Sequence, residues 1–163
     1  MIDLAKINQE KVLTGNDNIV IRKYIDGIEG GRDLDMTAYK ATTGSTILGA
    51  GHVIIKVTSN GVTTYKPMPV VQKTETTGSG NDAVTTNVTD ADGNPVYEYD
   101  SLPANHSYAG ILVASIDAAT NGAGIMTRGK VNKSDDVMPY SVTSILTALK
   151  AALPLIEFME DAD

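Results

Sequence analysis

The stretch His52-Val-Ile-Ile-Lys-Val-Thr-Ser-Asn-Gly-Val-Thr-Thr-Tyr-Lys66 decides the fold of this chain. In its first half Val53, Ile55 and Val57 fall on one face of an extended chain, which is the period of a β-strand. Asn60-Gly61 follows, and these two residues tolerate the positive φ angles of a tight hairpin turn. The stretch therefore predicts a β-hairpin with strands at 52–58 and 62–66.

Two further strands and a helix are expected toward the C-terminus. Residues 110–116 (GILVASI) are almost all apolar, as in a buried strand, and residues 124–131 (GIMTRGKV) alternate. From Ser141 to Leu153 the apolar residues recur with helical spacing, and Pro154 is expected to end that helix. Ser141 is predicted to cap it. The apolar residues that form one face of this helix are Val142, Ile145, Leu146, Leu149 and Leu153, and we call them the stripe. A closing strand is expected at 155–159.

The region between these strands is predicted to be an insertion, residues 72–101. Its first part, residues 72–89, is poor in apolar residues and rich in Thr, Gly, Ser and Asn, which indicates an exposed or mobile loop. Asp92-Gly-Asn-Pro95 favours a turn, and a short strand is expected at 96–99.

The N-terminal part, residues 1–46, is predicted to form an arm with its own β-hairpin. Residues 1–18 are polar and are expected to be loosely held, whereas Ile19–Ile25 is rich in β-branched residues and predicts a strand. Leu34–Ala41 is expected to return as its partner after a six-residue loop, 26–31. The whole chain is therefore predicted to be mainly β (α+β), with one C-terminal helix and a principal domain at 47–163.

Composition excludes several classes of protein. The chain has no Cys, so it forms no disulfide, thiolate nucleophile or zinc ribbon. The formal net charge is −7 and the sequence has no basic stripe, so binding of nucleic acid is not expected. The N-terminus lacks the apolar core of a signal peptide, and the most apolar window, 108–116, is too short to span a membrane.

No catalytic, cofactor-binding or metal-binding residue is assigned. The chain has two His: His52 shares a strand face with Lys56, and His106 lies in a polar loop, so both are expected at the surface. Asp90-Ala-Asp-Gly-Asn94 resembles the start of a calcium loop, but Ser101 stands where that loop needs Glu, so a β-turn is expected instead.

The order of segments in the C-terminal half resembles the phage lambda-type head decoration proteins. The residues that carry the likeness are Tyr108–Asp117, Gly124–Val131, Met138-Pro139, the helix and the strand 155–159, with Ala50–Lys56 and Lys66–Val70 matching the opening hairpin of that family. The likeness covers about residues 47–159. The long insertion and the N-terminal hairpin depart from the family pattern.

The resemblance implies a β-tulip-like domain that forms homotrimers on the outer surface of a virus capsid. It implies that the protein stabilises the shell by bridging major capsid protein subunits, and that an N-terminal arm adds a strand to a coat-protein sheet. The expected location is the virion, after synthesis in the host cytoplasm. The β-prone run of the arm then supplies the expected coat-protein contacts, Ile19, Val20, Ile21 and Tyr24.

Two alternatives remain open at this point. The protein could be a head fibre or another virion module that presents residues 72–101 to a receptor or glycan. It could also be a hydrolase that uses His52 or His106, although no nucleophile motif accompanies either residue.

Overall fold

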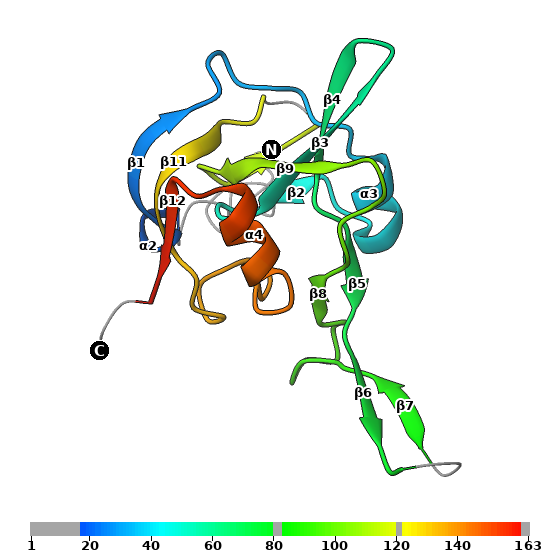
Figure 1. Ribbon diagram of the computed structural model, residues 1–163. Coiled ribbons are helices and arrows are strands. Elements are labelled where there is room, and N and C mark those ends of the chain that lie inside the picture. Colours follow the sequence, from blue (N-terminus) through cyan, green and yellow to red (C-terminus); the bar gives the residue numbers. More distant parts are fainter. Residues whose placement is uncertain (1–16, 80–82, 120–121, 161–163) are drawn as a thin grey trace, which may run out of the picture.

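The computed structural model describes residues 17–79, 83–119 and 122–160. It is mainly β, as the sequence predicts, and one of its helices is C-terminal (Figure 1). The helices are α2 (Asp17–Val20), α3 (Thr37–Thr43) and α4 (Leu146–Ala152). The strands are β1 (Ile21–Gly27), β2 (Ile47–Leu48), β3 (Val53–Ser59), β4 (Val62–Pro67), β5 (Val70–Gln72), β6 (Thr74–Thr77), β7 (Val84–Asn87), β8 (Tyr97–Tyr99), β9 (Ser107–Leu112), β10 (Ile116–Asp117), β11 (Ile125–Asn132) and β12 (Ile156–Met159).

A six-stranded sheet organises the molecule. Its order is β1-β11-β9-β3-β4, and β12 adds to β11 as the parallel neighbour. The other pairs in the sheet are antiparallel. Gly129 lies where β11 approaches β1 closely, because a Cβ atom there would collide with the carbonyl oxygen of Lys23. A glycine at this position therefore lets β1 lie against β11.

The predicted hairpin is confirmed as β3–β4. The register runs from Ile54 opposite Pro67 to Ser59 opposite Val62, with a two-residue turn between the strands. Asn60 and Gly61 have φ angles of 51° and 78°, which are the left-handed values that a tight hairpin turn requires.

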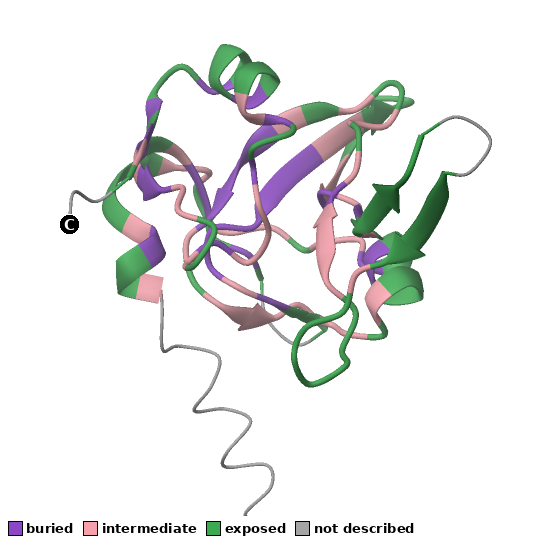
Figure 2. Ribbon diagram, turned by 90° about the horizontal axis from the view of Figure 1, so that it is seen from below, coloured by how far each residue is buried: buried purple, intermediate pink, exposed green. Residues whose placement is uncertain are grey.

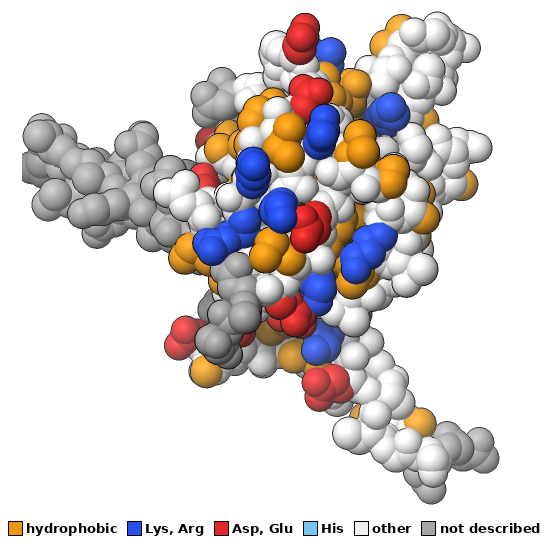
Figure 3. All heavy atoms as spheres, turned by 60° about the vertical axis from the view of Figure 1, so that its left-hand side comes forward, with side chains coloured by type: hydrophobic (Ala, Val, Ile, Leu, Met, Phe, Trp, Pro, Cys, Tyr) orange, Lys and Arg blue, Asp and Glu red, His pale blue; other side chains and the backbone are white. Residues whose placement is uncertain are grey.

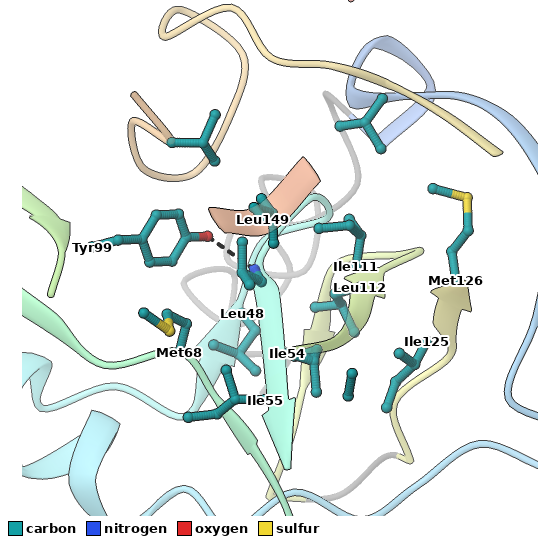
Figure 4. Close-up of a cluster of buried hydrophobic side chains, with 14 of the residues drawn as sticks. Leu48, Ile54, Ile55, Met68, Tyr99, Ile111, Leu112, Ile125, Met126 and Leu149 are labelled. Atoms are coloured by element: carbon teal, nitrogen blue, oxygen red, sulfur yellow. Dashed lines mark hydrogen bonds between the residues drawn. The ribbon is translucent and has the colours of Figure 1, made fainter. Parts of the chain in front are cut away.

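The core lies between this sheet and the C-terminal helix. Figure 4 shows Leu48, Ile54, Ile111 and Leu149 close together at the centre of the cluster, from β2, β3, β9 and α4, with Met126 of β11 at its side. These five side chains are completely or almost completely buried. The core of this chain, which has one Phe and no Trp, is thus largely aliphatic and is built from residues far apart in the sequence.

The C-terminal helix is shorter than predicted. α4 begins after Ile145 rather than after Ser141, and no side chain caps it. Residues 143–145 form a turn, closed by a hydrogen bond from the Ile145 N–H to the Val142 carbonyl oxygen. Four members of the predicted stripe are nevertheless buried: Val142, Ile145, Leu149 and Leu153. The periodicity identified the buried face correctly but placed the start of the helix too early.

The N-terminal hairpin is not formed. β1 pairs with β11 over Ile21–Gly27, and Ile19 and Val20 belong to α2 instead of the strand. The expected partner segment, 34–41, contains most of α3. Met36 and Tyr39 are buried three residues apart, and Gly44 ends the helix with a φ angle of 73°. Residues 1–16 of the predicted arm lie outside the described residues.

The insertion projects from the domain as a two-part arm (Figure 1). β5 pairs with β8 next to the domain, and β6 pairs with β7 farther out. Every residue of β6 and β7 is exposed, and Figure 2 shows this ribbon in green. The region expected to be a loop is therefore exposed, as predicted, but carries a regular ladder from Thr74–Asn87 to Thr77–Val84.

Candidate functional site

The strongest candidate site is the outer edge of the six-stranded sheet, formed by α2 and β1. Two contacts fix the start of this segment. The Asp17 carboxylate accepts hydrogen bonds from the backbone N–H (2.9 Å) and the hydroxyl of Ser115. Val20 is 1% exposed and packs beside Gly51, where a Cβ atom would collide with its side chain.

β1 itself is exposed on both faces. Five consecutive residues, 22–26, are exposed, although a strand that belongs to a sheet over a core normally buries alternate residues. Apolar side chains lie on this edge: Ile19 is 41% exposed, Tyr24 54% and Ile25 45%. Among the described strands β1 pairs with β11 alone, so no described strand occupies its other backbone edge.

The predicted coat-protein contacts fall into two groups, one accessible at the surface and one buried in the core. The structure places Ile19 and Tyr24 at the surface and Ile21 in a half-buried position at the start of β1. Val20 is different, because it lies in the core and anchors the strand instead of offering a contact. Ile25 is exposed beside Tyr24 and was not included in the prediction, although it belongs to the same β-prone run.

Basic side chains surround this edge. Figure 3 shows Lys and Arg side chains gathered on the side of the molecule where β1, β11 and β12 lie. We call five of them the basic rim: Arg22 and Lys23 on β1, Arg128 and Lys130 on β11, and Lys133 just after β11. Lys130 pairs with Glu157 of β12 (2.8 Å), and Lys133 pairs with Glu160. Hydrogen bonding to Lys133 holds the pKa of the Glu160 carboxyl below its usual range.

The prediction that His52 lies at the surface is wrong. His52 is fully buried, and its ring meets the rings of Tyr39, Tyr99 and Tyr140 edge-on at centroid distances of 5.4, 5.3 and 5.6 Å. Its Nε2 lies 3.2 Å from the Met68 carbonyl oxygen, and Nδ1 has no hydrogen-bond partner. Burial lowers the pKa of His52 to about 4, so the ring is neutral at pH 7.

The tyrosines around His52 connect separate parts of the fold. The hydroxyls of Tyr39 and Tyr140 are hydrogen-bonded at 2.7 Å, and the Val53 N–H donates to the Tyr99 hydroxyl at 3.0 Å. Burial raises the pKa values of Tyr99 and Tyr140, which keeps both phenols neutral. This cluster joins α3, β3, β8 and the segment before α4. The contacts of this cluster hold the fold together.

Neither histidine is placed for nucleophilic catalysis. Within the described residues His52 hydrogen-bonds only to a backbone carbonyl oxygen, and His106 Nδ1 lies 2.9 Å from the Ala104 carbonyl oxygen. A Ser-His-Asp arrangement needs a hydroxyl on one ring nitrogen and a carboxylate on the other. The described contacts of both rings lack these two partners.

The Asp90–Asn94 segment forms the predicted turn. One carboxylate oxygen of Asp90 accepts hydrogen bonds from the Asp92 N–H (2.9 Å) and the Asn94 N–H (2.8 Å). The hydrogen bonds from Asn94 lower the pKa of Asp90. In the described part of the chain, no three His, Asp or Glu side chains gather in a way that could hold a metal ion.

A cleft of about 580 Å³ opens at the base of the arm. It lies between β8 and the segment 135–144. Its walls carry two phenol rings, two carboxylates, a lysine and several hydroxyls: Tyr97, Tyr140, Glu98, Asp135, Lys73, Ser141, Thr143 and Ser144. The cleft is open to solvent and its walls are more polar than those of most small-ligand sites.

No helix in the described residues is long and apolar enough to cross a membrane. No family model, no curated protein and no solved structure matches this chain.

Proposed function

We propose that this chain is a bacteriophage capsid decoration protein, which trimerises on the outer capsid surface and stabilises the shell by bridging major capsid protein subunits. The proposal joins the resemblance of residues 47–159 to that class with one structural observation. The observation is β1, an edge strand whose residues 22–26 are exposed on both faces. Such a strand is a ready site for pairing with a second protein.

The chemistry of this edge supports a protein partner. A strand edge offers backbone N–H and C=O groups with which another β-strand can pair. The pairing of β1 with β11 is irregular at three points, so we expect a partner strand to pair with short stretches of β1. Tyr24 and Ile25 add apolar surface that a partner would remove from water. The coat protein of the shell is the partner that the decoration class requires.

The overall charge supports a place on the outside of the capsid. With a formal net charge of −7, the chain is repelled by the packaged DNA and has no electrostatic reason to face it. A structural role without catalysis is consistent with histidines that contact neither a carboxylate nor a serine.

Shell binding tests the proposal. Purified protein is mixed with empty shells of the cognate phage, and the bound fraction is measured after sedimentation. We expect saturable binding, and we expect the double variant Tyr24→Ser/Ile25→Ser to bind on the order of tenfold more weakly, since it loses apolar contact at the β1 edge. The matched control is Val62→Ser/Val84→Ser, which removes exposed apolar side chains elsewhere. Wild-type protein that stays in the supernatant would refute the proposal.

A receptor- or glycan-binding module of the virion remains the second candidate function. The observation that favours it is the arm of β5–β8, which extends well beyond the domain and has a cleft with Tyr97 and Tyr140 at its base. Rings and hydroxyls of this kind suit a neutral sugar. Saturable binding of purified protein to host cells, abolished by removal of residues 74–87, would favour this function over decoration.

A further inference from the structure

We propose that the β1 edge recognises an acidic segment of its partner, and that Lys23 and Arg128 of the basic rim supply the recognition. This inference rests on the proposed function, because it specifies the chemistry of the coat-protein segment that the decoration protein binds. The expected partner is a β-strand or extended segment flanked by Asp or Glu side chains.

The register of β1 and β11 brings the basic residues together. Lys23 is the cross-strand partner of Lys130, and Asp26 is the partner of Arg128. Residues opposite each other in an antiparallel pair project from the same face of the sheet, so Lys23 and Lys130 lie side by side. Arg128 precedes Lys130 by two residues on the same strand, and therefore belongs to the same face.

Two of these basic side chains, Lys23 and Arg128, are exposed and form no ion pair with a described residue. Lys130 and Lys133 have carboxylate partners in Glu157 and Glu160. Asp26 lies opposite Arg128 in the register without forming an ion pair with it. Lys23 lies opposite Lys130, and like charges in that arrangement destabilise a sheet. Because Glu157 already pairs with Lys130, Lys23 is the charge that a carboxylate from a partner would balance most directly.

The position of the rim contrasts with the overall charge of the chain. The protein carries 20 acidic and 13 basic residues, yet five of the basic ones lie around one strand edge. Complementary charge at an interface mainly raises the rate of association and fixes the register of the partner. A basic rim around an open backbone edge therefore selects among strands by their acidic flanks.

The surroundings of the rim favour a protein over a nucleic acid. Figure 3 shows hydrophobic side chains among the basic ones on this side of the molecule. Ile19, Tyr24 and Ile25 are exposed on α2 and β1, and their apolar surface offers nothing to a phosphate. An open strand edge, by contrast, is matched by another polypeptide strand.

Charge reversal at the two uncompensated positions tests the inference. The variant is Lys23→Glu/Arg128→Glu, and the probe is the empty shell of the cognate phage at about 50 and 300 mM NaCl, a range over which exposed charges become strongly screened. The matched control is Lys40→Glu/Lys150→Glu, which makes the same change of charge at exposed positions on α3 and α4. Thermal unfolding and solution mass establish that both variants keep the wild-type fold and assembly.

We expect the rim variant to bind shells on the order of tenfold or more weakly at low salt, with the control within about twofold of wild type. Wild-type binding should weaken with salt, and the rim variant should lose most of that salt dependence. Should the rim variant not fold, Lys23→Gln/Arg128→Gln removes the charges without reversing them and should weaken binding by a smaller factor.

Four results would overturn the inference. If wild type binds shells and the folded rim variant binds equally well, the rim is not the recognition element, while the decoration function stands. If the control variant binds shells as weakly as the rim variant, the effect is caused by the change in net charge and not by the position of the charges. If a short DNA duplex competes with shells for wild type, the partner class is wrong. Wild-type protein that fails to bind shells at all would refute both the inference and the decoration function.

Discussion

At the scale of single residues, His52 makes the stability of the fold depend on pH. Its pKa in the folded protein is about 4, because burial disfavours the charged ring, whereas an exposed imidazole titrates near about 6.5. The folded value lies below the unfolded one, so the unfolded chain binds more protons between the two. The contribution of neutral His52 is therefore complete above about pH 6.5 and is lost as the pH falls toward 4.

The free energy of unfolding is expected to fall by roughly 3 kcal/mol, which follows from the difference between the two pKa values. It is measured by urea unfolding of wild type and His52→Phe at pH 7 and pH 4. Acid-sensitive carboxylates such as Asp35 and Asp117 are shared by both proteins, so their contribution cancels in the comparison. Tyr39, Tyr99 and Tyr140, which surround the ring, stay neutral over this range. Equal pH dependence in both proteins would contradict the assignment.

The errors of sequence analysis at this scale have one cause. His52 was placed on a polar strand face because Lys56 shares it, and Val20 was expected to contact a partner because it belongs to the β-prone run 19–25 of the predicted arm. Alternation along a strand assumes that one face meets solvent. At the start of β3 both faces are covered, since Val53, Ile54 and Ile55 are all buried. The side chains that cover His52 are Tyr39 of α3 and Tyr99 of β8. No local sequence pattern near residue 52 indicates these distant neighbours.

At the scale of secondary-structure elements, α4 depends on one buried side chain. Leu149 is fully buried, and α4 packs against β9 and β12. We expect Leu149→Asp to abolish cooperative unfolding, because a carboxylate placed there has no solvent and no partner. Thr147→Asp is the control, since Thr147 lies on the exposed side of the same helix. Circular dichroism during heating distinguishes the two. A Leu149→Asp variant that melts like wild type would place α4 outside the core.

Elements set by local sequence were predicted well, and those set by distant contacts were not. The β3–β4 hairpin follows from Asn60-Gly61 and the flanking alternation, so its residues carry all the information needed. β1 was recognised as a strand, but its partner β11 lies about a hundred residues away and was replaced by the nearest β-prone segment. That segment holds α3 instead. Met36 and Tyr39 are apolar residues three positions apart, and Gly44 follows where a helix can end. This spacing was the signal that could have identified the helix.

The candidate site shows the same division. The β-prone run 19–25 predicted a strand, and the structure forms that strand from Ile21 onward, but the exposure of residues 22–26 on both faces was not evident from the run itself. The basic rim could not be found from sequence. Its members come from β1 and from β11, where they are scattered among other residues, and only the pairing of the two strands brings them together.

At the scale of the whole molecule, pairing of β1 with β11 changes what a truncation reports. If residues 1–25 formed a separate arm, their deletion would leave a folded trimer that binds shells more weakly. In the structure, however, this deletion removes Val20 from the core and most of β1 from the sheet. It also uncovers the edge of β11, a long strand whose open edge is prone to aggregate.

We therefore expect the chain lacking residues 1–25 to be less stable by about 3 kcal/mol or more, since it loses a buried aliphatic side chain and a row of strand hydrogen bonds. Urea unfolding measures the loss of stability, and light scattering during gel filtration detects aggregated material. Full-length Tyr24→Ser/Ile25→Ser is the control, because it alters the same edge while β1 stays in place. A truncated chain with wild-type stability and a discrete mass would mean that β1 belongs to a separable arm. Weakened shell binding would then report on the arm alone, and not on the integrity of the sheet that presents the edge.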